Sequence, residues 1–316
     1  MRRLFMTPNI FGVAALFLLA AASFYFAFEY SQYQAHAAAE AAAAAAAVET
    51  KPDPFENISI EGKSAIVIDL ASGKTLYEKG ADAQLPLASI TKVPLVLAVA
   101  EVLPLESSLT IPYDTPRTQS AEGLKAGEKW KVIDLINYTL VASSNEGADI
   151  LAAAANPTIR AKYPEAPQDG ATIWRMNMIA KEIGMQNTYF LNDNGLDLST
   201  TQSGAYASAR DVAKLFAYVA STSPSLFAGT AKNDLLITDE SGKTASATNT
   251  NEALGEIPGL ILGKTGYTDL AGGNLAVVFD VGLAHPVVAV VMGSSHDGRF
   301  SDMKTLVETA RRAVTQ

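Results

Sequence analysis

A serine and a lysine three residues apart offer the first chemistry in this 316-residue chain: Ser89 and Lys92 begin a predicted helix over Ser89–Leu103. Residues three apart on a helix share a face, so the hydroxyl and the amine are expected to lie side by side. A serine hydroxyl becomes a nucleophile when a base takes its proton, and a lysine serves as that base once burial or positive charge depresses its pKa. On its own, a serine followed three residues later by a lysine is more typical of a helix-capping serine and a solvated lysine.

Two further short segments carry groups that suit amide and carboxylate recognition. Ser143-Ser144-Asn145 follows a predicted helix over Val132–Leu140, and its hydroxyl and amide could relay a proton and hold a substrate amide. Lys264-Thr265-Gly266 ends a predicted strand over Leu260–Lys264, where the cation and hydroxyl could bind a carboxylate and the glycine lets a ligand approach. Alone, the first is an ordinary capping loop and the second an ordinary strand end with a solvated lysine.

Composition removes several other chemistries. The chain has no cysteine, which excludes disulfides, thiolate metal sites and cysteine nucleophiles. Its three histidines, His36, His285 and His296, show no spacing that indicates a Ser-His-Asp triad, although a triad is defined by geometry. We find no metal-binding His-Glu-x-x-His pattern and no phosphate-binding glycine loop, and therefore predict neither a metal nor a cofactor. The formal net charge of -9 disfavours a nucleic-acid partner.

The elements that must position these residues are strands at both ends of the domain and helices between them. The predicted strands are Ala65–Leu70, Lys74–Tyr77, Leu260–Lys264, Asn274–Val281 and Val287–Gly293. Helical spacing of apolar residues predicts Ser89–Leu103, Val132–Leu140, Thr172–Ile183, Ala209–Ala220 and Ser301–Val314. We expect the strands from both ends to join one antiparallel sheet covered by helices.

The N-terminal region predicts an exported protein. Arg2 and Arg3 precede an uncharged, mostly apolar run from Ile10 to Phe28, which is long enough for a membrane helix, and the positive-inside rule places the rest of the chain outside. The alternative is a cleavable signal peptide with Ala35-His36-Ala37 as its cleavage site. We therefore divide the chain into an anchor or signal segment at 1–34, an alanine-rich spacer at 35–54 and a folded domain at 55–316.

Together and in this order, the three segments match S-x-x-K, S-D-N and K-T-G, the signature set of class A β-lactamases and penicillin-binding proteins. The second segment keeps the serine and asparagine and has Ser144 in the middle. From Phe55 onward the sequence resembles the serine D-Ala-D-Ala carboxypeptidases, which are low-molecular-mass penicillin-binding proteins. The same resemblance extends to Ala65–Asp69, Ser72–Lys74, Gly127–Trp130, Met176-Asn177, Gly184-Met185, Asn194–Asp197 and Gly263–Thr268.

The resemblance implies a mixed α/β (α+β) fold: a β-lactamase-like α/β/α sandwich with an antiparallel sheet and a helical subdomain, and the site between them. It implies a peptidoglycan stem peptide as substrate and β-lactams as inhibitors. Ser89 would attack the bond between two D-alanines and form an acyl-enzyme, with Lys92 as general base. The backbone N–H groups of Ser89 and Tyr267 would form the oxyanion hole.

The remaining roles are carried over in the same way. Ser143 would pass a proton to the leaving D-alanine, and Asn145 would hold the acyl-side amide. Lys264 and Thr265 would bind the terminal carboxylate, and Gly266 would belong to the same substrate-binding strand.

Other functions remain open at this point. A D,D-endopeptidase that cuts crosslinks would use the same machinery, and a non-catalytic penicillin-binding sensor would keep the same fold. A class A β-lactamase is disfavoured because no Glu-x-x-Leu-Asn pattern lies between Asn145 and Lys264. Two departures from the family pattern are Glu146, which follows the motif asparagine, and an expected lack of the C-terminal β domain of many carboxypeptidases, which would leave tethering to the N-terminal segment.

Overall fold

The computed structural model describes residues 10–46, 52–113 and 124–315, with 10–15 and 41–46 described by backbone alone. Contacts divide the chain into two units, Met1–Pro52 and Asp53–Gln316. In its described part the first unit is helix α1 (Ile10–Ala46), whose side chains from 16 to 40 are exposed. Among the described residues, no helix combines the length and the apolar character needed to cross a membrane. Part of the predicted anchor over Ile10–Phe28 lies outside the described side chains.

The second unit is built on a five-stranded antiparallel sheet in the order β10-β11-β12-β1-β2. Its strands are β1 (Ser64–Asp69), β2 (Thr75–Lys79), β10 (Leu260–Thr268), β11 (Gly272–Asp280) and β12 (Pro286–Ser294). The two ends of the domain meet because β1 pairs with β12, with Ser64 opposite Met292. The predicted joint sheet is confirmed.

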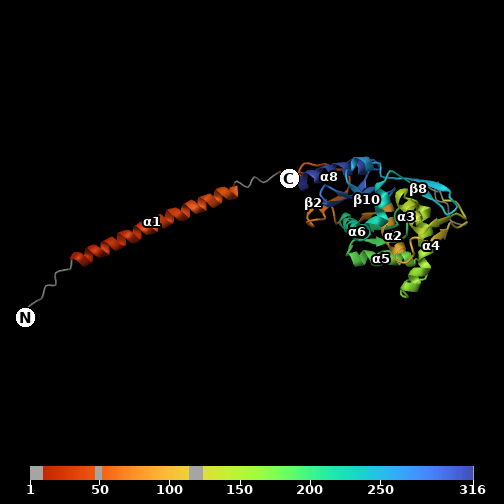
Figure 1. The fold of residues 1–316 in the computed structure, drawn as a ribbon, viewed down its shortest axis with the longest axis horizontal. Helices are drawn as coiled ribbons and strands as arrows, with labels where there is room; N and C mark the ends of the chain where they lie inside the picture. The colour runs from red at the N-terminus through yellow and green to blue at the C-terminus, as the bar shows by residue number, and fades with distance from the viewer. Residues whose placement is uncertain (1–9, 47–51, 114–123, 316) are drawn as a thin grey trace, which may run out of the picture. The chain divides into compact units, whose positions relative to one another are not determined.

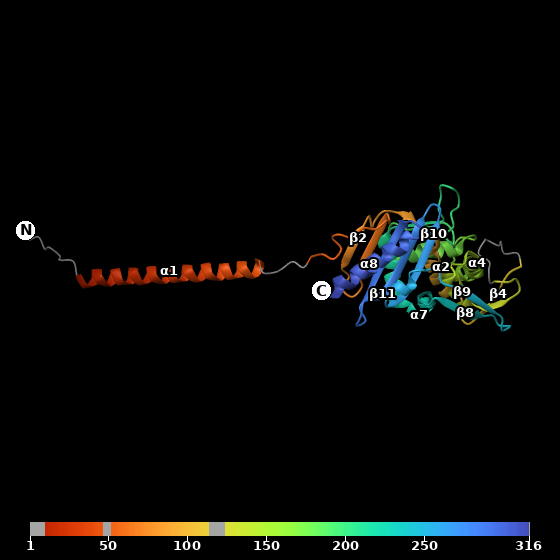
Figure 2. The same cartoon turned by 90° about the horizontal axis from the view of Figure 1, so that it is seen from above.

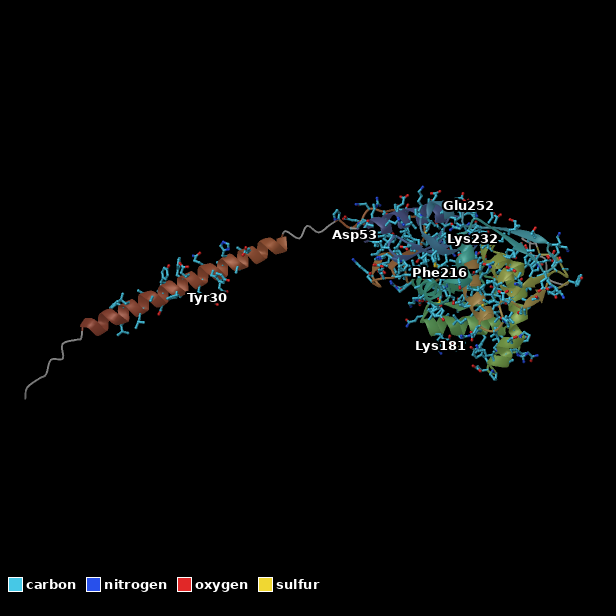
Figure 3. All side chains as sticks on the ribbon, viewed as in Figure 1. Tyr30, Asp53, Lys181, Phe216, Lys232 and Glu252 are labelled. Atoms are coloured by element: carbon cyan, nitrogen blue, oxygen red, sulfur yellow. The ribbon has the colours of Figure 1, made fainter. Side chains whose placement is uncertain are left out.

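Helices cover both faces of this sheet. Successive strand residues point to opposite faces, so Val277 and Val291 pack in one apolar cluster with α8 (Gly298–Thr315), and Ala276 and Val290 pack in another with α6 (Ala209–Thr222). Figure 2 shows α8 lying across the strands of the sheet, and Figure 1 shows α8 and α6 on opposite sides of it. Figure 3 shows Phe216 of α6 in the interior of the folded unit, surrounded by other side chains. The predicted α/β/α sandwich is confirmed.

The apolar cluster that packs α6 against the sheet extends into a helical region. It contains α2 (Lys92–Ala100), α3 (Val132–Val141), α4 (Asn145–Lys162) and α5 (Ala171–Ile183), which contribute the buried side chains of Leu95, Leu135, Leu151 and Met176, respectively. The shorter elements are β3 (Leu85–Pro86), β4 (Ser108–Thr110), β5 (Lys129–Lys131), β6 (Tyr189–Phe190), β7 (Ala205–Ala207), β8 (Asp234–Thr238), β9 (Thr244–Thr248), α7 (Pro224–Phe227), and the 3-10 turns η1 (Ala88–Thr91), η2 (Ala228–Ala231) and η3 (Leu254–Glu256).

Two of the boundaries that differ from the sequence prediction bear on the site. The helix predicted from Ser89 starts as the tight turn η1 and becomes α-helical only at Lys92. The strand predicted to end at Lys264 continues to Thr268, because pairing with β11 extends to Thr268 opposite Gly272. Helix α4 was not predicted, since its buried face is rich in alanine and carries a weak apolar signal.

Candidate active site

Lys92 is fully buried, and its Nζ lies among three oxygens. The distances from Nζ are 2.8 Å to Ser89 Oγ, 2.7 Å to Asn145 Oδ1 and 2.9 Å to the carbonyl oxygen of Asn194. The amide oxygen and the carbonyl oxygen can only accept hydrogen bonds. The two N–H groups of a neutral amine therefore point to Asn145 and Asn194, and the lone pair points to the Ser89 hydroxyl. This is the orientation that a general base needs.

The charge state of Lys92 suits the same role. Burial lowers the pKa of the amine from the usual 10.5 to about 7, and the carboxylate of Asp149 opposes this by raising it. A substantial fraction of Lys92 is consequently unprotonated at neutral pH. The pKa of Lys264, which is also buried, lies well below its usual value because of burial first and the charges of Lys92 and Arg299 second.

Ser143 enters the site from the connection between α3 and α4. Its φ of 57° lies in the left-handed region, which residues with a side chain seldom adopt. Lys264 Nζ donates to Ser143 Oγ at 2.8 Å and to the Thr265 carbonyl oxygen at 2.9 Å. The Lys264 amine thus joins the hydroxyl of the second segment to the strand of the third.

The middle residue of the second segment has a structural task. Ser144 is the N-cap of α4, and its Oγ accepts from the backbone N–H of Gly147 at 3.0 Å. Serine and aspartate are both favoured N-caps, so Ser144 can fill the place of the motif aspartate without loss of the cap. Glu146, the other departure noted in the sequence, is buried in the first turn of α4, where the helix dipole favours a negative charge.

Strand β10 runs against η1, the turn that carries Ser89. A Cβ on Gly266 would lie 2.7 Å from the carbonyl oxygen of Leu87 and 3.2 Å from the backbone nitrogen of Ser89, so glycine permits this close approach. β10 is also an edge strand of the five-stranded sheet, and an edge offers backbone groups to an extended peptide. Tyr267, next along the strand, is half exposed, and its ring meets that of His296 at a centroid distance of 4.9 Å.

The structure thus brings the predicted residues into two hydrogen-bonded groups, Ser89–Lys92–Asn145 and Ser143–Lys264–Thr265, with Gly266 against the turn that carries Ser89. The histidines bond elsewhere: His285 Nε2 lies 2.7 Å from Asp69 Oδ1, and His296 Nδ1 lies 2.6 Å from Asp297 Oδ1. In the part of the chain that is described, no three His, Asp or Glu side chains gather as a metal-ligand set. A cavity of about 580 Å³ beside α2 is lined by none of the predicted site residues.

Comparison with known proteins adds the family. Residues 46–296 match the family described as D-alanyl-D-alanine carboxypeptidase. The chain belongs to this family. Membership confirms the family predicted from the three motifs, and with it a serine-type hydrolase.

Among its relatives, the chain is 30% identical over 245 residues to the D-alanyl-D-alanine carboxypeptidase DacF of Bacillus subtilis. The aligned region covers 74% of this chain and 58% of that protein. It is 29% identical over 264 residues to a D-alanyl-D-alanine endopeptidase of Escherichia coli, covering 80% of this chain and 79% of that protein. Among solved structures, penicillin-binding protein D2 of Listeria monocytogenes in its ampicillin-bound form is 28% identical with a TM-score of 0.67, covering 80% of this chain and 98% of that one.

Several residues of this D-alanyl-D-alanine carboxypeptidase family member reach the site although sequence reasoning gave them no role. Arg299 donates from Nη1 to the Gly266 carbonyl oxygen at 2.9 Å, and Thr250 Oγ1 lies 2.5 Å from Thr265 Oγ1. The Asn194 carbonyl oxygen binds Lys92. Asn194 lies 102 residues from Lys92, whereas Arg299 lies 33 residues from Gly266 and Thr250 lies 15 residues from Thr265. Only Asn194 lay in a segment that the family resemblance had singled out.

Proposed function

We propose that this chain is a serine D-alanyl-D-alanine carboxypeptidase that releases the terminal D-alanine of peptidoglycan stem peptides through an acyl-enzyme on Ser89. The observation that carries the proposal is the Lys92 amine, which is buried, has its pKa lowered by burial to about 7 and lies 2.8 Å from Ser89 Oγ. A solvated lysine beside a capping serine would have none of these properties.

In the proposed acylation, Lys92 Nζ takes the proton of Ser89 Oγ while Oγ bonds to the carbonyl carbon of the penultimate D-alanine. The carbonyl oxygen becomes an oxyanion that accepts from the backbone N–H groups of Ser89 and Tyr267, and one such donor contributes roughly 3–4 kcal/mol to the transition state. The C–N bond then breaks. The proton taken by Lys92 leaves on the nitrogen of D-alanine by way of Ser143 Oγ.

Deacylation repeats these transfers with water. Lys92 takes a proton from the water molecule, the hydroxide bonds to the ester carbon, and the C–O bond to Ser89 breaks. Ser89 Oγ regains the proton, and the shortened peptide leaves as a carboxylic acid. The same amine therefore serves both half-reactions, which requires that it return to the neutral form between them.

Substrate recognition follows from the two hydrogen-bonded groups. Asn145 uses Oδ1 on Lys92, which leaves Nδ2 to hold the carbonyl of the acyl-side amide. We propose that the terminal carboxylate lies against Lys264 and the hydroxyl of Thr265, with Thr250 as a second hydroxyl beside it. Binding of an anion there would favour the charged form of Lys264.

A labelling experiment tests this function. Wild-type protein is expected to form a covalent adduct with a fluorescent penicillin and to release D-alanine from a pentapeptide ending in D-Ala-D-Ala. Ser89→Ala should form no adduct, and Lys92→Arg should acylate slower by orders of magnitude, because arginine stays protonated. Labelling that survives Ser89→Ala would refute the nucleophile. Cleavage of a crosslinked dimer without D-alanine release from the pentapeptide would instead support an endopeptidase.

We also infer that the folded unit works outside the cytoplasm, as a cell-wall enzyme of this family does. We propose that the N-terminal segment serves export in one of two ways. It either tethers the chain to the membrane through Ile10–Phe28 or is cleaved near Ala35-His36-Ala37.

A further inference from the structure

The third oxygen at Lys92 is held by an acidic residue to which no role has yet been given. Asp149 follows Asn145 by four residues on α4, so the two side chains share one face of the helix. Asn145 binds Lys92 directly. Asp149 Oδ1 accepts from Asn194 Nδ2 at 2.8 Å, and the carbonyl oxygen of Asn194 binds Lys92 at 2.9 Å. One helix face therefore reaches the amine twice, once directly and once through Asn194.

The side chain of Asn194 is fixed at both of its polar atoms. Nδ2 donates to Asp149, and Oδ1 accepts from the backbone N–H of Leu196 at 2.9 Å. Because the side chain and the carbonyl belong to one residue, fixing the first restricts where the second can lie. The direction of the Lys92 lone pair depends on that carbonyl, since it accepts one of the two N–H groups of the neutral amine.

Asp149 also acts on Lys92 through its charge. It raises the pKa of the lysine against the larger effect of burial. Other charged groups approach from the neighbouring elements. Asp193 lies in the same loop as Asn194 and has a pKa raised to about 7, by burial first and by Asp149 second. The amine of Lys264 on β10 interacts electrostatically with Lys92 and with Arg299 on α8.

We propose that Asp149 is a positioning residue of the Ser–Lys site, which fixes the direction of the Lys92 lone pair through Asn194 and places a negative charge close to the amine. The inference rests on the proposed acylation of Ser89 by way of Lys92. The proposal explains why the half-buried Asp149 carboxylate lies close to Lys92. Its charge limits how far burial can lower the basicity of the Lys92 amine, and a stronger base takes the Ser89 proton more readily.

Three variants separate the two effects. Asp149→Asn keeps an oxygen that can accept from Asn194 and removes the charge. Asn194→Ala keeps the backbone carbonyl and the Asp149 charge and removes the link between them. Asp149→Ala removes both. Glu308→Gln, which removes one exposed charge on α8, serves as the matched control.

The readout is the second-order rate constant of acylation by a fluorescent penicillin between pH 5 and pH 10, together with the melting temperature of each variant. For Asp149→Asn, loss of the negative charge lowers the pKa of Lys92, so the acid limb should move to lower pH by on the order of one unit. Acylation at pH 6 should then rise about fivefold, because the unprotonated fraction grows from about one in eleven to about one half. The alkaline plateau should fall slightly, because the weaker base takes the Ser89 proton less readily.

The other variants are expected to behave differently. Asn194→Ala should keep the acid limb in place and lower the plateau about tenfold through misorientation of the base, and Asp149→Ala should show both changes. An acid limb of Asp149→Asn that coincides with the wild type overturns the role of the charge. Plateaus of Asn194→Ala and Asp149→Ala equal to wild type overturn the positioning role, as do losses that only follow the fall in melting temperature. If the wild type is not labelled on Ser89 at all, the proposed function fails first.

Discussion

Gly195 gives the sharpest test of how the site is held together. This glycine has a φ of 84°, and a Cβ added to it would lie 2.0 Å from the carbonyl oxygen of Ala88 and 2.5 Å from its carbon. Ala88 is the residue immediately before Ser89, and it has itself a φ of 49°. The loop that supplies the Asn194 carbonyl to Lys92 therefore also presses, through its next residue, on the turn that carries the nucleophile.

Gly195→Ala should disturb both fold and catalysis, and the two contributions can be estimated. An alanine in the left-handed region costs about 1–2 kcal/mol. Real Cβ atoms essentially never come within 3.0 Å of such a neighbour, so a contact of 2.0 Å requires the Ala88 carbonyl or the loop to move by at least about 1 Å. A displacement of 1 Å at reacting groups costs on the order of 100-fold in rate. We therefore expect acylation by a fluorescent penicillin to fall about 100-fold.

Gly184 provides the matched control. Its φ is 80°, and a Cβ there would meet nothing within 4 Å, so Gly184→Ala carries the same backbone strain without the collision. Both variants should melt at lower temperature than the wild type, but only Gly195→Ala should lose acylation rate in the folded state. Equal acylation rates for the two variants, measured well below their melting temperatures, would refute the view that the 192–197 loop positions Ser89.

Two other predictions concern the second motif and the N-terminal segment. Ser144→Ala should lower the free energy of unfolding by about 1 kcal/mol through loss of the α4 N-cap, whereas Ser144→Asp should retain most of it; urea titration measures both, and an unchanged midpoint for alanine would contradict the capping role. If Ile10–Phe28 is an anchor, cell fractionation should place the full chain with the membranes until detergent is added. Recovery of a soluble chain that begins just after Ala37 would support cleavage instead.

Much of the fold could be predicted from the sequence because its signals are local. The strands that end the domain are short runs of valine, isoleucine and leucine, and α6 and α8 carry apolar residues at helical spacing. The order of the three motifs was sufficient to predict the family.

The contacts that complete the site could not be predicted in this way. Asn194 lies 102 residues from Lys92, and Asp149 lies 45 residues from Asn194. No periodicity or propensity links such positions, because their proximity depends on how α4, the 192–197 loop and η1 pack. The strand end predicted at Lys264 was wrong for a related reason: glycine at 266 weakens a strand signal locally, while pairing with β11 maintains the strand.

Two of the four non-glycine residues with a positive φ in the described part of the chain belong to the site. Ala88 and Ser143 both have left-handed backbone, at 49° and 57°, and each adjoins or supplies a predicted catalytic group. Such conformations cost on the order of 1–3 kcal/mol each, and Lys92 adds the cost of a buried amine. Contacts from distant segments offset these costs: Gly195 closes on Ala88, Lys264 binds Ser143, and Asn145 with Asn194 satisfies Lys92. Unfolding any one of these segments would therefore release strain at the nucleophile as well as lose a contact, which is why the site should lose acylation activity before the sheet and its two helical layers unfold.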